Sequence, residues 1–165
     1  MRTCLGIVMA MCLFLAGGVR AQAAPLTDDT LKAMLENLGY TVTVTGDKAP
    51  RHFKVDESAP INSLDFTITF DLSSAKDATV LWIYAGLYEI PAGKPAPSSA
   101  LLALLAKNDE IGPIFFSYNA DNKLLYLNAP TANVDITPAV LRQKIKTFIG
   151  RMDSTYSLWN VKTWK

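Results

Sequence analysis

The chain has 165 residues, 50% of them hydrophobic and 19% charged, and its 16 Lys and Arg against 15 Asp and Glu give a net charge of +1. This length suits one domain that can bury a core of its own. The lack of a basic excess argues against nucleic acid as a partner, and the single histidine argues against a transition-metal site.

The first 23 residues predict a secretory signal peptide. Arg2 supplies a positive start, residues 5–16 form an uncharged run, and Ala21-Gln22-Ala23 is a small-x-small exit. The uncharged run is shorter than the ~20 residues that a membrane-spanning helix needs, so we expect no stable membrane insertion after the leader is removed. The protein is therefore predicted to be exported, to the periplasm or the extracellular space.

Cleavage of the leader is expected between Ala23 and Ala24. A cut one residue later is disfavoured because it would place Pro25 in the scissile bond. Both cysteines, Cys4 and Cys12, lie in the leader. The mature domain, residues 24–165, is thus expected to fold as one unit without a disulfide bond.

The mature domain is predicted to begin with a helix and two short strands. Thr27 is expected to cap a helix with one apolar stripe, which is formed by Leu31, Met34, Leu35 and Leu38. Gly39 ends this helix in a left-handed conformation. The β-branched residues of 40–45 predict a strand, and the alternation around Phe53 and Val55 predicts a second one.

The next two strands carry different patterns. In residues 64–72 hydrophobic side chains occupy every second position, with Asp or Thr between them. This period of two predicts an antiparallel strand with one buried face and one wet face. Residues 80–88 are more continuously apolar, which predicts a strand that is either covered on both sides or central, and Trp82 is expected in the core.

The second half of the mature domain is predicted as helix, hairpin and helix. After a proline-rich loop at 91–98, Ser98 or Ser99 is expected to cap a helix with leucines on one side, namely Leu101, Leu102, Leu104 and Leu105. A strand from Pro113 to Tyr118 and its hairpin partner at 124–127 follow. Thr137 and Pro138 then start a helix that is expected to run to about Tyr156, with an extended tail after it.

This order of helix, three or four strands, helix, hairpin and helix predicts an α+β fold with helices packed on an antiparallel sheet. Together with LLALLAKNDEIGPIFFSYNADNKLLYLNAP (101–130), LKAMLENLGYTVTV (31–44) and ITPAVLRQKI (136–145), it resembles the YbjN-like family, whose fold is similar to that of type III secretion chaperones. The most specific part of the resemblance is residues 108–113, followed by Phe115 and Phe116. The resemblance implies a binding or regulatory module, either a monomer or a homodimer, with no catalytic residues and no cofactor.

The residues themselves offer little for catalysis. No G-x-S-x-G motif accompanies His52, which is expected on a surface or edge strand. Asp65 and Asp71 share a strand face but should lie ~20 Å apart, too far for a paired carboxylate mechanism. The cluster of Asn119, Asp121 and Asn122 is best explained as a hairpin turn rather than a metal site.

Two surfaces remain as candidates for binding. Four basic residues on the last helix, Arg142, Lys144, Lys146 and Arg151, are expected to form a solvated face. Trp159 and Trp164 lie near the end of the chain, where they either pack on their own domain or form an interface.

The sequence therefore favours an exported, non-enzymatic module that binds a protein partner or a second copy of itself. Two alternatives remain open. One is a hydrolase or small-ligand-binding protein whose carboxylates come from separate strands, and the other is a structural component of the cell envelope held by the tail tryptophans.

Overall fold

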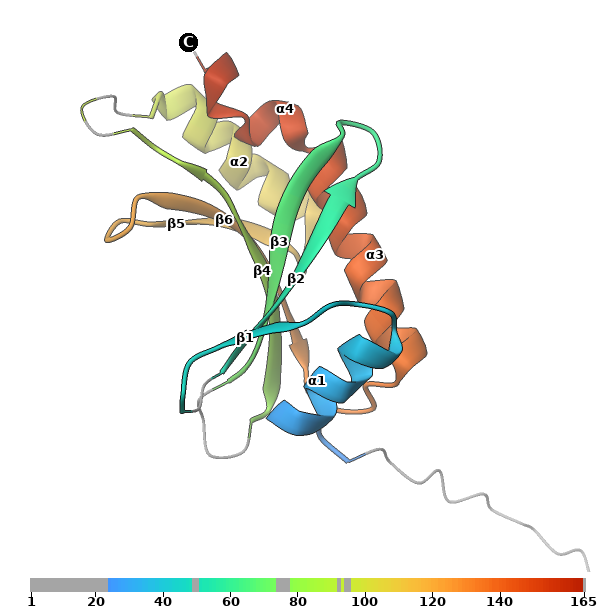
Figure 1. Cartoon of the computed structure of the whole chain (residues 1–165). Coiled ribbons are helices and arrows are strands. Elements are labelled where there is room, and N and C mark those ends of the chain that lie inside the picture. Colours follow the sequence, from blue (N-terminus) through green and yellow to red (C-terminus); the bar gives the residue numbers. More distant parts are fainter. Residues whose placement is uncertain (1–23, 49–50, 74–77, 92, 94–95, 165) are drawn as a thin grey trace, which may run out of the picture.

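The computed structural model describes residues 24–48, 51–73, 78–91, 93 and 96–164 (Figure 1). The expected signal peptide, with Ala23, lies outside the described residues, so its cleavage stays a prediction. Ala24 and Pro25 are exposed, and Leu26 is the first buried residue. In the described part of the chain, no helix is both long and apolar enough to span a bilayer.

The fold is α+β, as predicted, with one six-stranded antiparallel sheet in the order β1-β2-β3-β4-β6-β5. The strands are β1 Thr43–Thr45, β2 His52–Ala59, β3 Leu64–Leu72, β4 Val80–Glu89, β5 Phe115–Asn119 and β6 Leu124–Ala132. The helices are α1 Asp28–Asn37, α2 Ser98–Ile111, α3 Pro138–Ser154 and α4 Tyr156–Trp159, followed by a short 3-10 helix at Val161–Thr163. β6 lies between β4 and β5, so the last hairpin joins the sheet through its second strand.

The helices lie on one side of a strongly twisted sheet (Figure 1). The core lies between these two layers, and it takes alternate residues from each strand. On β4, Leu81, Ile83 and Ala85 are at most 1% exposed, whereas the residues between them are only half-buried. β2 follows the same alternation, and its buried Phe53 is directly opposite the buried Phe70 of β3. On β3 the alternation is interrupted at Thr69, which is 7% exposed between the buried Ile68 and Phe70. One face of the sheet is therefore covered by helices, and the other has none.

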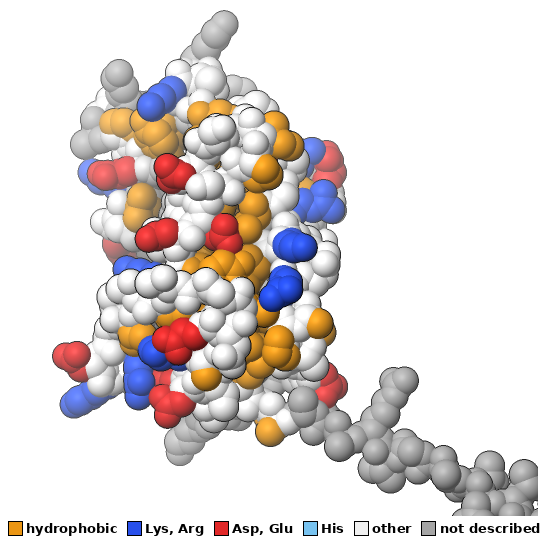
Figure 2. Space-filling view, turned by 45° about the vertical axis from the view of Figure 1, so that its right-hand side comes forward, with side chains coloured by type: hydrophobic (Ala, Val, Ile, Leu, Met, Phe, Trp, Pro, Cys, Tyr) orange, Lys and Arg blue, Asp and Glu red, His pale blue; other side chains and the backbone are white. Residues whose placement is uncertain are grey.

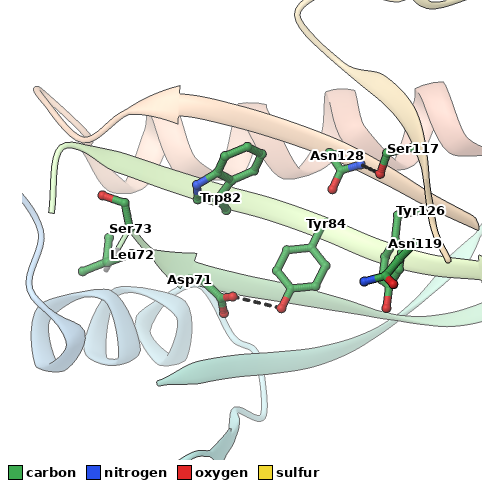
Figure 3. Close-up of a pocket in the computed structure, with 9 residues that line it drawn as sticks. All are labelled: Asp71, Leu72, Ser73, Trp82, Tyr84, Ser117, Asn119, Tyr126 and Asn128. Carbon is green, nitrogen blue, oxygen red and sulfur yellow. Dashed lines mark hydrogen bonds between the residues drawn. The ribbon is translucent and has the colours of Figure 1, made fainter. Parts of the chain in front are cut away.

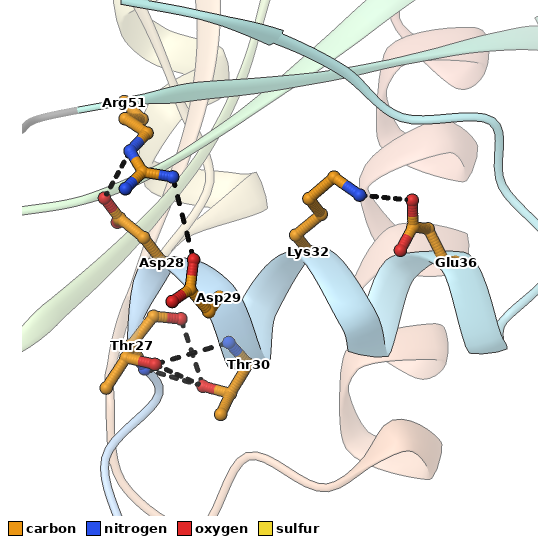
Figure 4. Close-up of polar contacts among 7 residues, drawn as sticks. All are labelled: Thr27, Asp28, Asp29, Thr30, Lys32, Glu36 and Arg51. Carbon is orange, nitrogen blue, oxygen red and sulfur yellow. Dashed lines mark hydrogen bonds and ion pairs between the residues drawn. The ribbon is translucent and has the colours of Figure 1, made fainter. Parts of the chain in front are cut away.

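Helix α1 begins and ends where its sequence predicts. The Thr27 side chain accepts a hydrogen bond from the Thr30 backbone N–H, and the Thr30 hydroxyl accepts one from the Thr27 N–H (Figure 4). This reciprocal capping satisfies backbone donors that a helix start leaves free. Arg51 lies 3.6 Å from carboxylate oxygens of both Asp28 and Asp29, which connects the helix start to the beginning of β2.

The start of α3 agrees with the sequence prediction, whereas the tail after it does not. Thr137 caps α3 and Pro138 occupies its first turn, as expected. The helix ends at Ser154, two residues before the expected end near Tyr156, and Thr155 is its C-cap, with the Thr155 hydroxyl donating to the Arg151 carbonyl at 2.7 Å. The tail then forms α4 and the 3-10 helix, so the predicted extended conformation is wrong.

Helix α2 does not bury its leucines as predicted. Leu104 is 3% exposed, but Leu101, Leu102 and Leu105 are 37%, 64% and 62% exposed. The helix packs on β5 at the edge of the sheet and on α4, so only a narrow stripe of its surface is covered. Its N-cap is Pro97, with no side-chain hydrogen bond, rather than either serine.

Two buried polar side chains hold distant segments together, and neither was predicted. Asn133, 3% exposed, accepts from the Leu26 N–H and donates to the carbonyls of Leu26 and Ala78, each at 2.9 Å. Asp153, also 3% exposed, lies at the end of α3 and contacts the β2–β3 turn. These contacts fix where the chain enters the domain and how α3 sits against the sheet.

Hydrogen bonds from the β2–β3 turn keep the Asp153 carboxyl in its charged form. Its Oδ2 accepts from the Ile61 N–H at 2.8 Å, and its Oδ1 accepts from the Asn62 side chain at 2.6 Å and the Asn62 N–H at 3.1 Å. Burial by itself raises the pKa of Asp153, but these hydrogen bonds stabilise the charged form more, so the pKa is held below its usual range. The carboxylate is therefore kept charged in the folded protein.

Candidate functional site on the open face of the sheet

The helix-free face of the sheet carries a hollow of about 520 Å³ (Figure 3). We call it the open-face hollow, and it is lined by Asp71, Leu72, Ser73, Trp82, Tyr84, Ser117, Asn119, Tyr126 and Asn128. Its volume falls within the roughly 300–1,000 Å³ typical of small-ligand sites. The lining residues come from β3, β4, β5 and β6 and from the β3–β4 connection, so only the assembled sheet creates the hollow.

The strand register pairs each aromatic residue of the hollow with a polar one. Trp82 is opposite Asp71, Tyr84 is opposite Asn128, and Tyr126 is opposite Ser117. Directly opposed side chains on one face of a sheet are near neighbours. The surface therefore alternates aromatic rings with hydrogen-bonding groups.

Trp82 is not a core residue, contrary to the sequence prediction. It is half-buried and its ring lies in the open-face hollow beside Tyr84 (Figure 3). The prediction was wrong because the apolar run of β4 suggested burial on both sides, whereas helices cover only one. Tyr126 meets Tyr84 edge-on, with ring centres 6.1 Å apart and planes at 63°, and this contact bounds one end of the hollow.

A polar network borders the hollow. The Tyr84 hydroxyl donates to Asp71 Oδ2 at 2.9 Å, and His52 Nδ1 lies 2.8 Å from Asp71 Oδ1. Burial, and then the neighbouring Asp71 carboxylate, raise the pKa of Tyr84, so its phenol stays protonated at neutral pH. Both carboxylate oxygens of Asp71 thus have a partner within the protein.

His52 is half-exposed, with 40% of its side chain accessible, but it lies on β2, the second strand of the sheet rather than an edge strand. Its contact with Asp71 could orient the ring, as a carboxylate orients a catalytic histidine. A hydrolase would also need a second reactive group. Asp71 is the sole carboxylate among the residues that line the hollow.

The other carboxylates considered from sequence are elsewhere. Asp65 accepts a hydrogen bond from Ser58 at 2.6 Å and is not among the residues that line the hollow. Among the described residues, no three His, Cys, Asp or Glu side chains are grouped so that they could hold a metal ion. The Asn119 side chain accepts from the Asp121 N–H at 2.9 Å, which confirms the predicted hairpin turn.

A second exposed surface lies at the edge of the sheet, on the helix side. Leu101 and Leu105 of α2 line a groove of about 220 Å³ against β5, together with Tyr118 of β5, which is 48% exposed. Leu102, 64% exposed, lies next to Leu101 on the same helix. We call these four residues the α2–β5 surface. Monomeric proteins rarely expose such a group of large apolar side chains without an interaction partner.

The basic residues of α3 form no comparable surface. Arg142, Lys146 and Arg151 are exposed and Lys144 is half-buried. Figure 2 shows that, on this side of the molecule, positive side chains alternate with acidic and hydrophobic ones rather than forming one continuous patch. This mixture agrees with the predicted solvated face.

The tail tryptophans pack on their own domain. Trp159 is 6% exposed, donates from its indole N–H to the Met152 carbonyl at 3.0 Å, and meets Tyr156 edge-on. Trp164 is half-buried and donates to the Leu158 carbonyl at 2.9 Å. Their further role in an interface stays a prediction.

Comparison with known proteins identifies the fold. No family model matches the chain, and no curated protein matches its sequence. A chain in the HopA1–SchA chaperone–effector complex superposes with a TM-score of 0.52 and 14% identity, over 75% of this chain and 88% of that one. A chain in the heterodimeric ExoU–SpcU complex from the type III secretion system of Pseudomonas aeruginosa superposes with a TM-score of 0.50 and 14% identity, over 77% and 95%.

These similarities confirm the predicted resemblance in fold to type III secretion chaperones. Membership of the YbjN-like family stays a prediction.

Proposed function

We propose that residues 24–165 form an exported, non-enzymatic module that binds protein, and that the α2–β5 surface joins it to a second copy of itself. The observation that carries this proposal is the exposure of three leucines on α2 beside β5, an edge strand of the sheet. The similarity in fold to chains from a chaperone–effector complex and a heterodimeric secretion-system complex supports a protein as the ligand.

The two edges of the sheet differ in how easily they could pair. β1 has three residues, so it offers few backbone groups. β5 has five, with the sequence FFSYN and therefore no charged residue or proline. Short strands, charges and prolines are the usual protection of a sheet edge. β5 lacks the last two, and an antiparallel edge can pair with its own copy across a two-fold axis.

Sedimentation equilibrium across micromolar concentrations tests the dimer. We expect the wild-type domain to dimerise, and Leu102→Lys or Leu105→Lys to give a monomer, because each would place a charge in an apolar contact. Ile61→Lys is the matched control, since Ile61 is 78% exposed on the β2–β3 turn and should leave the dimer intact. A wild-type monomer at every concentration would show that self-association is wrong, and crosslinking in cells would then identify any other protein on this surface.

Export is tested separately by mass spectrometry on fractionated cells. The mature protein is expected in the exported fraction with Ala24 at its N-terminus. Full-length protein that remains uncut in the cytosol would contradict this part of the proposal and leave the fold-based part untouched.

A further inference from the structure

We propose that the open-face hollow binds a proline-rich segment of a partner protein in the polyproline II conformation. The inference rests on the proposed function in one respect, that the occupant belongs to a protein. It concerns a different surface from the α2–β5 surface, on the opposite face of the sheet. Polyproline II segments are recognised by aromatic-lined grooves because they are already ordered before they bind.

Three aromatic rings, which we call the aromatic floor, line the hollow. Trp82 and Tyr84 are two residues apart on β4 and both line the hollow, with the Tyr84 ring turned toward Asp71 of β3 (Figure 3). Tyr126 meets Tyr84 edge-on at one end. Tryptophan and tyrosine rings provide a large apolar contact at little cost in side-chain entropy. Their half-buried rings are held in place by the strands and by the Tyr84–Asp71 hydrogen bond. The floor is therefore preorganised for a ligand that stacks on it.

Free hydrogen-bond donors also line the hollow. The Trp82 indole N–H and the Asn119 side-chain amide donate to no residue in the part of the chain that the structure describes. Ser117 and Tyr126 use their oxygens to accept from Asn128 and Asn122, both at 2.8 Å, which leaves their hydroxyl hydrogens available. A proline-rich segment has a carbonyl acceptor at every residue and few N–H donors. A donor-rich hollow complements that chemistry.

The hollow is lined by few charged side chains. No lysine or arginine is among the residues that line the hollow, so an acidic or phosphorylated ligand would find no counter-charge there. Its single carboxylate, Asp71, already accepts from Tyr84 and contacts His52, and it is 16% exposed. A strongly basic ligand is therefore matched poorly as well. The hollow suits an uncharged segment.

The position of the hollow excludes binding by strand addition. An added strand needs the free backbone groups of a sheet edge. β4 and β6, which carry the three aromatic residues, each have strands on both sides. A ligand that lies over β4 and β6 therefore meets side chains rather than free backbone groups, which suits a polyproline II segment.

The test uses isothermal titration calorimetry on the purified protein with decaproline, and with a ten-residue Gly-Ser peptide for comparison. We expect saturable binding of decaproline alone. Trp82→Ala should weaken it at least about tenfold, as expected for an aromatic anchor. Ile61→Ala is the control, because Ile61 is 78% exposed on the β2–β3 turn, outside both the hollow and the α2–β5 surface, and it should bind as the wild type does.

Thermal unfolding of each variant confirms that it is folded before binding is compared. Failure of decaproline to bind the folded wild type, or equal binding by Trp82→Ala, would overturn the proposal. Binding of cellohexaose that Trp82→Ala abolishes, without binding of decaproline, would also overturn it and assign the hollow to saccharides. The α2 leucine variants report on the proposed function separately, since they leave this face unchanged.

Discussion

The two faces of the sheet use the same strands for opposite purposes. On β4, Ile83 is 1% exposed in the core, while its neighbours Trp82 and Tyr84 are half-buried on the face without helices. Burial of the apolar side chains on the covered face stabilises the folded protein. The aromatic rings on the open face are only half-buried, so they contribute less to the stability of the fold. They lie next to polar side chains, some of which have free hydrogen-bond donors. The comparison indicates that the covered face maintains the fold and that the open face is available for binding.

The largest expected difference in stability is between substitutions at two adjacent residues of β4. Ile83→Ala should lower the free energy of unfolding by about 2–5 kcal/mol, because it removes buried methyl groups and leaves a cavity. Trp82→Ala should lower it by about 1 kcal/mol, as for an average substitution. Urea unfolding of both variants measures the difference. Equal losses would contradict the division between the faces.

The next effect concerns the entry of the chain into the covered side. Asn133→Ala should cost about 1–3 kcal/mol, because the Leu26 N–H and two carbonyls would lose their buried partner. Asn37→Ala is the control, since Asn37 is exposed at the end of α1. Thermal unfolding should show a clear decrease for the first variant and little change for the second.

A pH dependence should distinguish Asp153 from the exposed carboxyls. The pKa of Asp153 is lower in the folded protein than in the unfolded chain, so the unfolded chain binds the proton more readily. The stability it contributes is present above about pH 4 and is lost as the pH falls through the lower folded value. The difference in stability between wild type and Asp153→Asn should therefore shrink from pH 6 to pH 2. A difference that stays constant would contradict the assignment.

The smallest effect belongs to the polar network of the open face. Tyr84→Phe should cost about 0.5–1.5 kcal/mol, the typical net value of one hydrogen bond. Because the pKa of Tyr84 is raised in the folded state, the wild type should lose stability as the pH rises above about 10. The variant should lose less. Tyr40, whose pKa burial and then Glu57 raise to about 12, should account for the loss that remains.

Local features of the structure could be predicted from neighbouring residues. The α1 cap at Thr27, the left-handed Gly39 and the Thr137–Pro138 start of α3 all formed as expected. The alternation in 64–72 correctly predicted a strand with one buried face. These features depend on hydrogen bonds and side-chain spacing within a few residues, so the local sequence is enough to predict them.

The exposure of α2 could not be predicted in this way. Four leucines within five residues indicated a buried side, yet Leu104 alone among them is buried. How much of a helix is covered depends on where it lies over the sheet, and α2 lies at the edge. Its hydrophobic pattern therefore could not distinguish a core contact from a binding surface.

The sequence by itself determined the class of fold, the positions of most helices and strands, and the expectation of export. Only the tertiary structure decided which face of the sheet stays open, and that decision brought Asp71, Tyr84 and Asn128 together from three strands. The physical reason is distance along the chain. Local hydrogen bonding acts over a few residues, whereas the hollow, the Asp153 contact across 92 positions and the exposed leucines depend on how separate elements pack.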